Sequence, residues 1–144
     1  MVATVTSYST DDLTQLLGTE LSSTPELIDA VRRGLPYSVF ERVRDTLGVS
    51  AQMLTGLIGV PVRTLNKRKH EGRFSSEESD NLLRVVRVVS KTFDFFDEPQ
   101  AARAWLAAPE RAFDDDTPLS LLDTETGAQE IFRLLGQLEH GVLP

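Results

Sequence analysis

The sequence predicts an all-α fold, with a helix-turn-helix part ahead of a second helical part. Residues that start helices (Ser, Thr or Asp, several with a proline close behind) recur along the chain, and glycine follows most of the segments they open. Apolar residues recur at helical spacing, and no segment of convincing length alternates apolar and polar residues as a strand does. We therefore expect short helices joined by tight turns.

The first half of the chain predicts five short helices, each with a recognisable start or stop. Thr24 is expected to be an N-cap, because Pro25 then takes the first helical position, where a missing N–H costs nothing. The five helices are expected over residues 10–17, from Thr24 to Gly34, over 37–47, from Ser50 to Gly59 and from Pro61 to Gly72.

The longest predicted helix follows Gly72 and begins with a capping box. The Ser75 hydroxyl is placed to accept from the backbone of Glu78, whose carboxylate reaches back to the backbone of Ser75. An apolar stripe at helical spacing should be buried against other helices. It consists of Leu82, Val86, Val89, Phe93 and Phe96.

Shorter elements are expected beyond the long helix. A helix begins near Pro99, a single turn follows Thr117, and Asp123 or Thr124 caps a last helix that Gly141 ends. The helix after Pro99 is expected to bury Ala101, Ala104, Trp105 and Ala108. The last helix is expected to bury Ile131, Leu134, Leu135 and Leu138.

The composition excludes several kinds of chemistry. The 144 residues include no cysteine and only two histidines, so disulfides, thiolate zinc sites, cysteine nucleophiles and multi-histidine metal centres are excluded. No apolar run has membrane-spanning length, and the N-terminus lacks a basic region followed by a hydrophobic stretch. We expect a cytoplasmic protein without a membrane partner.

Charge is unevenly distributed along this acidic chain, whose formal net charge is −7. Residues 61–91 carry 8 Lys/Arg against 4 Asp/Glu, a balance of +4. Residues 92–144 carry 3 against 11, a balance of −8. A basic segment in a chain that otherwise repels polyanions is typical either of a solvated helix face or of a local phosphate-contacting surface.

A helix-turn-helix motif coincides with the basic segment. Leu54, Leu57 and Ile58 form one apolar face, Gly59 stands where a sharp turn needs a positive φ, and Leu65 is the central apolar residue of the second helix. The second helix should offer Arg, Asn and Lys side chains that suit guanine, adenine and phosphate. The predicted DNA-binding residues are Arg63, Thr64, Asn66, Lys67, Arg68, Lys69 and Arg73.

One such motif offers a small interface, so useful affinity requires a symmetric dimer on two half-sites. The alternative is a helical hairpin with a solvated basic face.

No residue set combines a nucleophile, a base and an orienting group, so we expect no enzyme activity and no cofactor. Asp114, Asp115 and Asp116 lack the spacing of a calcium loop and are interpreted as a solvated loop, so we expect no metal.

Residues about 48–144 resemble the Xre/MbcA/ParS antitoxins of bacterial toxin–antitoxin pairs. Arg84 stands where that family often has a basic residue on the long helix, and Gly141-Val142 after an amphipathic helix also fits. Further motifs occur in the family's order. They are the link Gly72–Ser79, the alanine–tryptophan–leucine–proline segment Ala101–Pro109, and Thr117–Gly127.

The resemblance implies a partner and a division of the chain. Members neutralise a cognate toxin, which for Xre-type members is usually a RES-domain toxin that destroys NAD, and often repress their own operon. It implies a helical extension over residues 1–47, a DNA-binding region over 48–73, a toxin-binding or dimerisation domain over 74–144, and a homodimer or higher oligomer. Trp105 and the last helix would support dimerisation or toxin contact. The tail expected to bind the toxin is Gly141, Val142, Leu143 and Pro144.

A second interpretation keeps the DNA-binding part without a toxin. The chain would then be a helix-turn-helix transcriptional regulator whose C-terminal domain senses a small ligand or a partner. The two interpretations differ in whether a toxin gene lies beside this one.

Overall fold

A computed structural model describes residues 10–21 and 23–141, and these residues form α-helices and short 3-10 turns with no strand among them. The predicted all-α fold is confirmed. The elements are α1 (Thr10–Leu17), α2 (Thr24–Arg33), α3 (Tyr37–Leu47), α4 (Ala51–Ile58), α5 (Val62–Glu71), α6 (Ser76–Phe96), α7 (Pro99–Ala107), the turns η1 (Arg111–Phe113) and η2 (Leu119–Asp123), and α8 (Glu125–Glu139).

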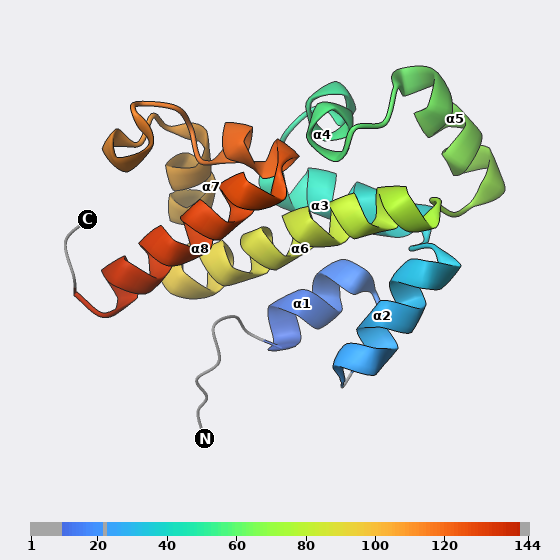
Figure 1. The fold of residues 1–144 in the computed structure, drawn as a ribbon, viewed down its shortest axis with the longest axis horizontal. Coiled ribbons are helices and arrows are strands. Elements are labelled where there is room, and N and C mark those ends of the chain that lie inside the picture. The colour runs from blue at the N-terminus through green and yellow to red at the C-terminus, as the bar shows by residue number, and fades with distance from the viewer. Residues whose placement is uncertain (1–9, 22, 142–144) are drawn as a thin grey trace.

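The long helix α6 is the centre of the molecule. Helices α1, α2, α3, α4, α7 and α8 all pack on it, so that it is covered on several sides (Figure 1). Its middle is almost continuously apolar, and Val85, Val86, Val88 and Val89 are fully buried. Within residues 10–21 and 23–141, no helix has the length and apolar character needed to cross a membrane.

Helix starts largely follow the sequence signals. The capping box is confirmed, because the Ser75 hydroxyl accepts from the Glu78 backbone while the Glu78 carboxylate accepts from the Ser75 backbone. Thr124 caps α8, with its hydroxyl accepting from Gly127 N at 2.9 Å. The expectation of Thr24 as a cap was wrong: Ser23 caps α2, its hydroxyl accepting from Glu26 N at 3.3 Å.

The predicted inner face of α7 was also wrong. Ala101, Ala104 and Ala108 are exposed, whereas Ala102 and Leu106 are buried. Trp105 is half-buried, its ring 5.6 Å from that of Phe96. In so short and alanine-rich a helix the apolar pattern is weak, and the single leucine decides which side faces α6.

Close contact between α8 and η2 depends on Gly127. This glycine is buried, and a methyl group at its Cα would overlap the backbone carbonyl oxygen of Leu121. Only hydrogen can stand there, so the first turn of α8 lies directly against the backbone of η2. On the other side of η2 lies α4, and this contact joins the two halves of the chain.

Candidate functional site

The turn between α4 and α5 has helix-turn-helix geometry. Gly59 has a φ of +71°, and Val60 N donates to the carbonyl of Thr55 at 3.0 Å, which folds the chain back after α4. Leu65 lies on the inner face of α5 and is buried, as the motif predicts. Thr55 is buried too, and its hydroxyl donates to the carbonyl of Gln52 at 2.7 Å.

The outward side of α5 carries most of the predicted DNA-binding residues. Arg63, Asn66, Lys67 and Lys69 are exposed, and Thr64 is half-buried. Nothing in the described part of the chain forms a hydrogen bond or an ion pair with the side chains of Arg63, Asn66 or Lys67. The helix lies at one end of the molecule (Figure 1), so this surface is open to a large partner.

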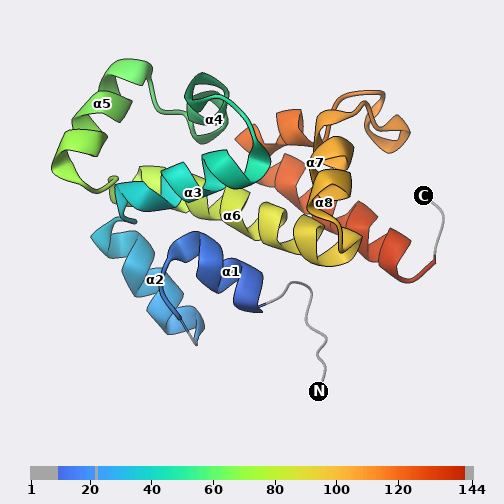
Figure 2. The same ribbon diagram turned by 180° about the vertical axis from the view of Figure 1, so that it is seen from behind.

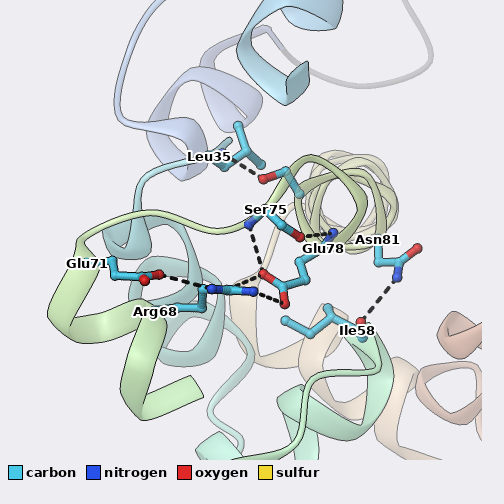
Figure 3. A network of polar contacts seen from close by, with 8 residues as sticks. Leu35, Ile58, Arg68, Glu71, Ser75, Glu78 and Asn81 are labelled. Carbon is cyan, nitrogen blue, oxygen red and sulfur yellow. Dashed lines mark hydrogen bonds and ion pairs between the residues drawn. The ribbon is translucent and has the colours of Figure 1, made fainter. Parts of the chain in front are cut away.

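Arg68 differs from its neighbours because its guanidinium is bound within the protein (Figure 3). Its Nε and Nη2 donate to the two carboxylate oxygens of Glu78 at 2.7 and 3.1 Å, and its Nη1 donates to Glu71 at 3.0 Å. The Arg68 side chain is only 20% exposed. Arg68 therefore anchors α5 to the start of α6, and the remaining basic side chains supply the open surface.

Glu78 is held as a carboxylate by this arrangement. Partial burial alone would raise the pKa of Glu78, but hydrogen bonds from Arg68 and from Ser75, together with the charge of Arg68, outweigh it and lower the pKa below its ordinary value. The same carboxylate raises the pKa of Arg68. The charged forms of both side chains are favoured, as expected for a bidentate pair.

Arg73 is also engaged by the protein, although its side chain is exposed. Its Nη1 donates to the carbonyl of Gly34 at 2.5 Å. Around it, the link from α5 to α6 lies against the link from α2 to α3, where Leu35 N donates to the buried hydroxyl of Ser79 at 2.7 Å. Phe74 N donates to the Leu35 carbonyl at 3.0 Å, so backbone as well as side chains fix the position of α5.

Two polar residues of α6 that the DNA-binding prediction did not include connect this helix to α4 and to η2. Asn81 donates to the carbonyl of Ile58 at the end of α4, at 3.2 Å (Figure 3). Arg84 donates to the carbonyls of Leu122 and Asp123 at the end of η2, at 3.1 and 3.2 Å. Both side chains satisfy carbonyls that a helix end leaves without partners.

The C-terminal end of α8 is tied to α6 by a largely buried lysine. Lys91 is 3% exposed, and its Nζ lies 2.9 Å from a carboxylate oxygen of Glu139. Gly141 follows, exposed and with a φ of +72°. Of the predicted toxin-binding tail, Val142, Leu143 and Pro144 lie outside the described residues.

The acidic loop between η1 and η2 shows no metal-ligand arrangement. Asp114 and Asp115 have φ values of +55° and +69°, and all three aspartates of the loop are exposed. No group of three or more potential His, Asp or Glu ligands gathers around one point in the ranges 10–21 and 23–141.

Comparison with known protein families identifies two segments. Residues 26–87 match the antitoxin Xre-like helix-turn-helix domain, and residues 91–141 match the antitoxin Xre/MbcA/ParS C-terminal toxin-binding domain. Together with the α4–α5 geometry, these matches define the class of protein as an antitoxin with a helix-turn-helix domain and a toxin-binding domain.

Individual relatives agree over nearly the whole chain. An antitoxin Xre of Yersinia enterocolitica is 34% identical over 88% of this chain and 86% of its own length. An antitoxin Xre of Photorhabdus laumondii is 31% identical over 91% and 90%. A Sphingobium protein named Prs ADP-ribosylating antitoxin is 25% identical over 83% and 82%. The chain belongs to the Xre antitoxin family.

Proposed function

We propose that this antitoxin neutralises a RES-domain toxin that degrades NAD, and that it represses its own operon by binding DNA through α5. The observation that carries the proposal is the separation of two surfaces. The basic outward side of α5 and the C-terminal end of α8 lie at opposite ends of the molecule (Figures 1 and 2). An antitoxin with this arrangement has room for DNA at one end and a toxin at the other.

For DNA binding, the proposal assigns direct contacts to the exposed side of α5 and a positioning role to Arg68. Arg63 and Asn66 are of the types that pair with guanine and adenine, and Lys67 is suited to phosphate. Arg68 is held by Glu71 and Glu78, so it acts by fixing the angle at which α5 is presented. Two copies related by a two-fold axis would read two half-sites.

For toxin binding, the proposal assigns the contact to the region that begins with Gly141. Residues 92–144 carry a balance of 3 Lys/Arg against 11 Asp/Glu. An acidic segment of this kind complements the basic entrance expected of an enzyme that takes the anionic substrate NAD. The Lys91–Glu139 pair fixes the last turn of α8 on α6, directly before this region.

The DNA half is tested by a gel shift with operator DNA at moderate salt. The double variant Arg63→Ala/Lys67→Ala should lose operator binding and retain toxin neutralisation, because neither side chain has a partner in the described protein. Arg111→Ala, which removes an exposed charge from the other half of the chain, is the matched control and should bind as the native chain does. Equal binding by the double variant would remove α5 from the DNA contact.

The toxin half is tested by ending the chain after His140 and expressing it with the product of the neighbouring gene. Growth should be lost and cellular NAD should fall, while operator binding persists. Growth loss without a fall in NAD would replace the RES toxin with another toxin class. Unchanged growth protection would overturn the assignment of the tail, and absence of any toxic neighbour would favour a regulator that senses a ligand or partner.

A further inference from the structure

We infer that the open cavity lined by α1, α3, α6 and α7 is a binding site for a small organic anion. The cavity has a volume of about 440 Å³ and takes its wall from all four helices. That size is within the ordinary range of small-molecule sites. It is separate from the outward side of α5 and from the end of α8, so the inference does not depend on how DNA or toxin binds.

Two cationic side chains line the cavity and retain unused hydrogen-bond donors. Arg42 donates from Nη1 to the carbonyl of Leu16 at 3.4 Å, and Arg103 donates from Nε to the carbonyl of Thr46 at 2.7 Å. Each guanidinium has five N–H groups, and no other hydrogen bond occupies them in the described part of the chain. Both guanidinium groups are half-buried and line the same cavity, so an anionic group there can accept from N–H donors of both.

No carboxylate inside the cavity supplies that anion. Asp45 contributes to the wall, but its carboxylate is bound to Arg44 Nε at 3.1 Å and its side chain is 72% exposed. The Asp45 charge is therefore directed to the rim and to solvent. The two arginines are left with a net positive cavity, which favours a carboxylate or a phosphate group held by several N–H donors at once.

Ser90 adds a buried polar atom that the protein does not satisfy. It lies in the middle of α6 on the cavity wall, is 0% exposed, and its Oγ has no hydrogen-bond partner in the described residues. Thr92, two residues on, instead donates to the Val88 carbonyl at 2.7 Å. A buried hydroxyl without a partner is costly. Because solvent does not reach this Oγ, a ligand in the cavity does not contact it either, and the anionic group is left to the two arginines.

The rest of the wall is apolar. Leu16, Val89 and Phe93 contribute to it, and Phe93 also lies under the Arg103 guanidinium, 5.8 Å from ring centroid to Cζ. These side chains suit a small hydrocarbon or aromatic body attached to the anionic group. The ligand class is thus a carboxylate or phosphate monoester with a compact apolar part.

The test is isothermal titration of the full chain with phenyl phosphate, benzoate, inorganic phosphate and neutral benzyl alcohol. We expect phenyl phosphate, benzoate or both to bind saturably, with inorganic phosphate weaker and benzyl alcohol not binding; the ratio of the first two identifies the anionic group. Absence of binding by every anion up to about 10 mM, where even a weak site fills, would overturn the inference.

Variants locate the site. Arg42→Gln should weaken binding about tenfold or more, whereas Arg111→Gln, outside the cavity, should leave it unchanged. Arg103→Gln should weaken binding to a similar extent, whereas Ser90→Ala should leave binding unchanged and raise the Tm of the unliganded chain, because it removes the unsatisfied hydroxyl. Circular dichroism checks that each variant is folded. Binding that is the same in Arg42→Gln and Arg103→Gln as in the native chain would exclude the cavity as the site.

Discussion

The carboxylate of Glu78 accepts hydrogen bonds from both Nε and Nη2 of Arg68, at 2.7 and 3.1 Å, and this bidentate pair joins α5, the second helix of the helix-turn-helix, to the start of α6. Glu78 also completes the capping box of α6 with Ser75. One carboxylate therefore starts the central helix and fixes the helix before it, so the angle of α5 depends on a residue of α6.

Replacement of Arg68 should lower stability and DNA affinity together. Arg68→Gln leaves the Glu78 carboxylate without its bidentate partner, and we expect a lower urea midpoint of unfolding, measured by urea titration. Arg63→Ala is the control and should change DNA affinity with little effect on stability. If Arg68→Gln lost operator binding at full stability, Arg68 would be a direct DNA contact instead.

Acid should weaken the same link. The pKa of Glu78 in the folded chain is below its ordinary value of 4.5, so its stabilising contribution is complete above that value and is lost as the pH falls through the folded pKa. The difference in unfolding free energy between the native chain and Glu78→Gln should therefore be constant near neutral pH and shrink below pH 4.5. A difference that is independent of pH would contradict a charged Glu78.

Alanine should have opposite effects at two glycines of α8. Gly127→Ala puts a methyl group into the Leu121 carbonyl, and the backbone must shift, with an expected loss of about 2 kcal/mol. At Gly136 a methyl group meets no atom within 4 Å, so Gly136→Ala should stabilise the helix by up to about 1 kcal/mol. Thermal unfolding compares the two, and similar changes in Tm would contradict close packing of α8 on η2.

The buried lysine of α6 should be sensitive to the loss of its partner. Glu139→Gln leaves Lys91, 3% exposed, without its carboxylate; because the Glu139 side chain is itself 41% exposed, we expect a loss of about 1 to 2 kcal/mol. Lys91→Met removes the charge and keeps the apolar stem, so it should be close to neutral. Urea unfolding of both variants distinguishes a buried pair from a surface pair, for which both changes would be small.

Lys67 should contribute to DNA affinity through phosphate alone. Lys67→Ala should weaken binding to specific and unrelated DNA by similar factors, and should reduce the slope of log affinity against log salt by about one. Arg63→Ala should instead weaken specific binding more than non-specific binding. Fluorescence anisotropy over a salt series measures both, and an unchanged slope in Lys67→Ala would place that side chain outside the interface.

Local signals in the sequence were sufficient for most helix boundaries. Capping at Ser75 and the turn at Gly59 involve atoms within a few residues, so periodicity and cap chemistry predicted them. Arg68 was predicted to face DNA because nothing near it indicates Glu78, ten residues away on another helix. The inner face of α7 and the cavity at Ser90 likewise depend on how distant helices pack, which periodicity does not encode.

The shared helix α6 has a consequence for how this protein can be dissected. The two family segments meet between residues 87 and 91, in the middle of that helix. A cut directly after Arg87, where the helix-turn-helix match ends, would separate Val85 and Val86 from Val88 and Val89, all of them completely enclosed in the intact chain. Each piece would expose side chains that the intact chain buries on α6, so point substitutions, not truncations at that junction, are the means of silencing one activity while preserving the other.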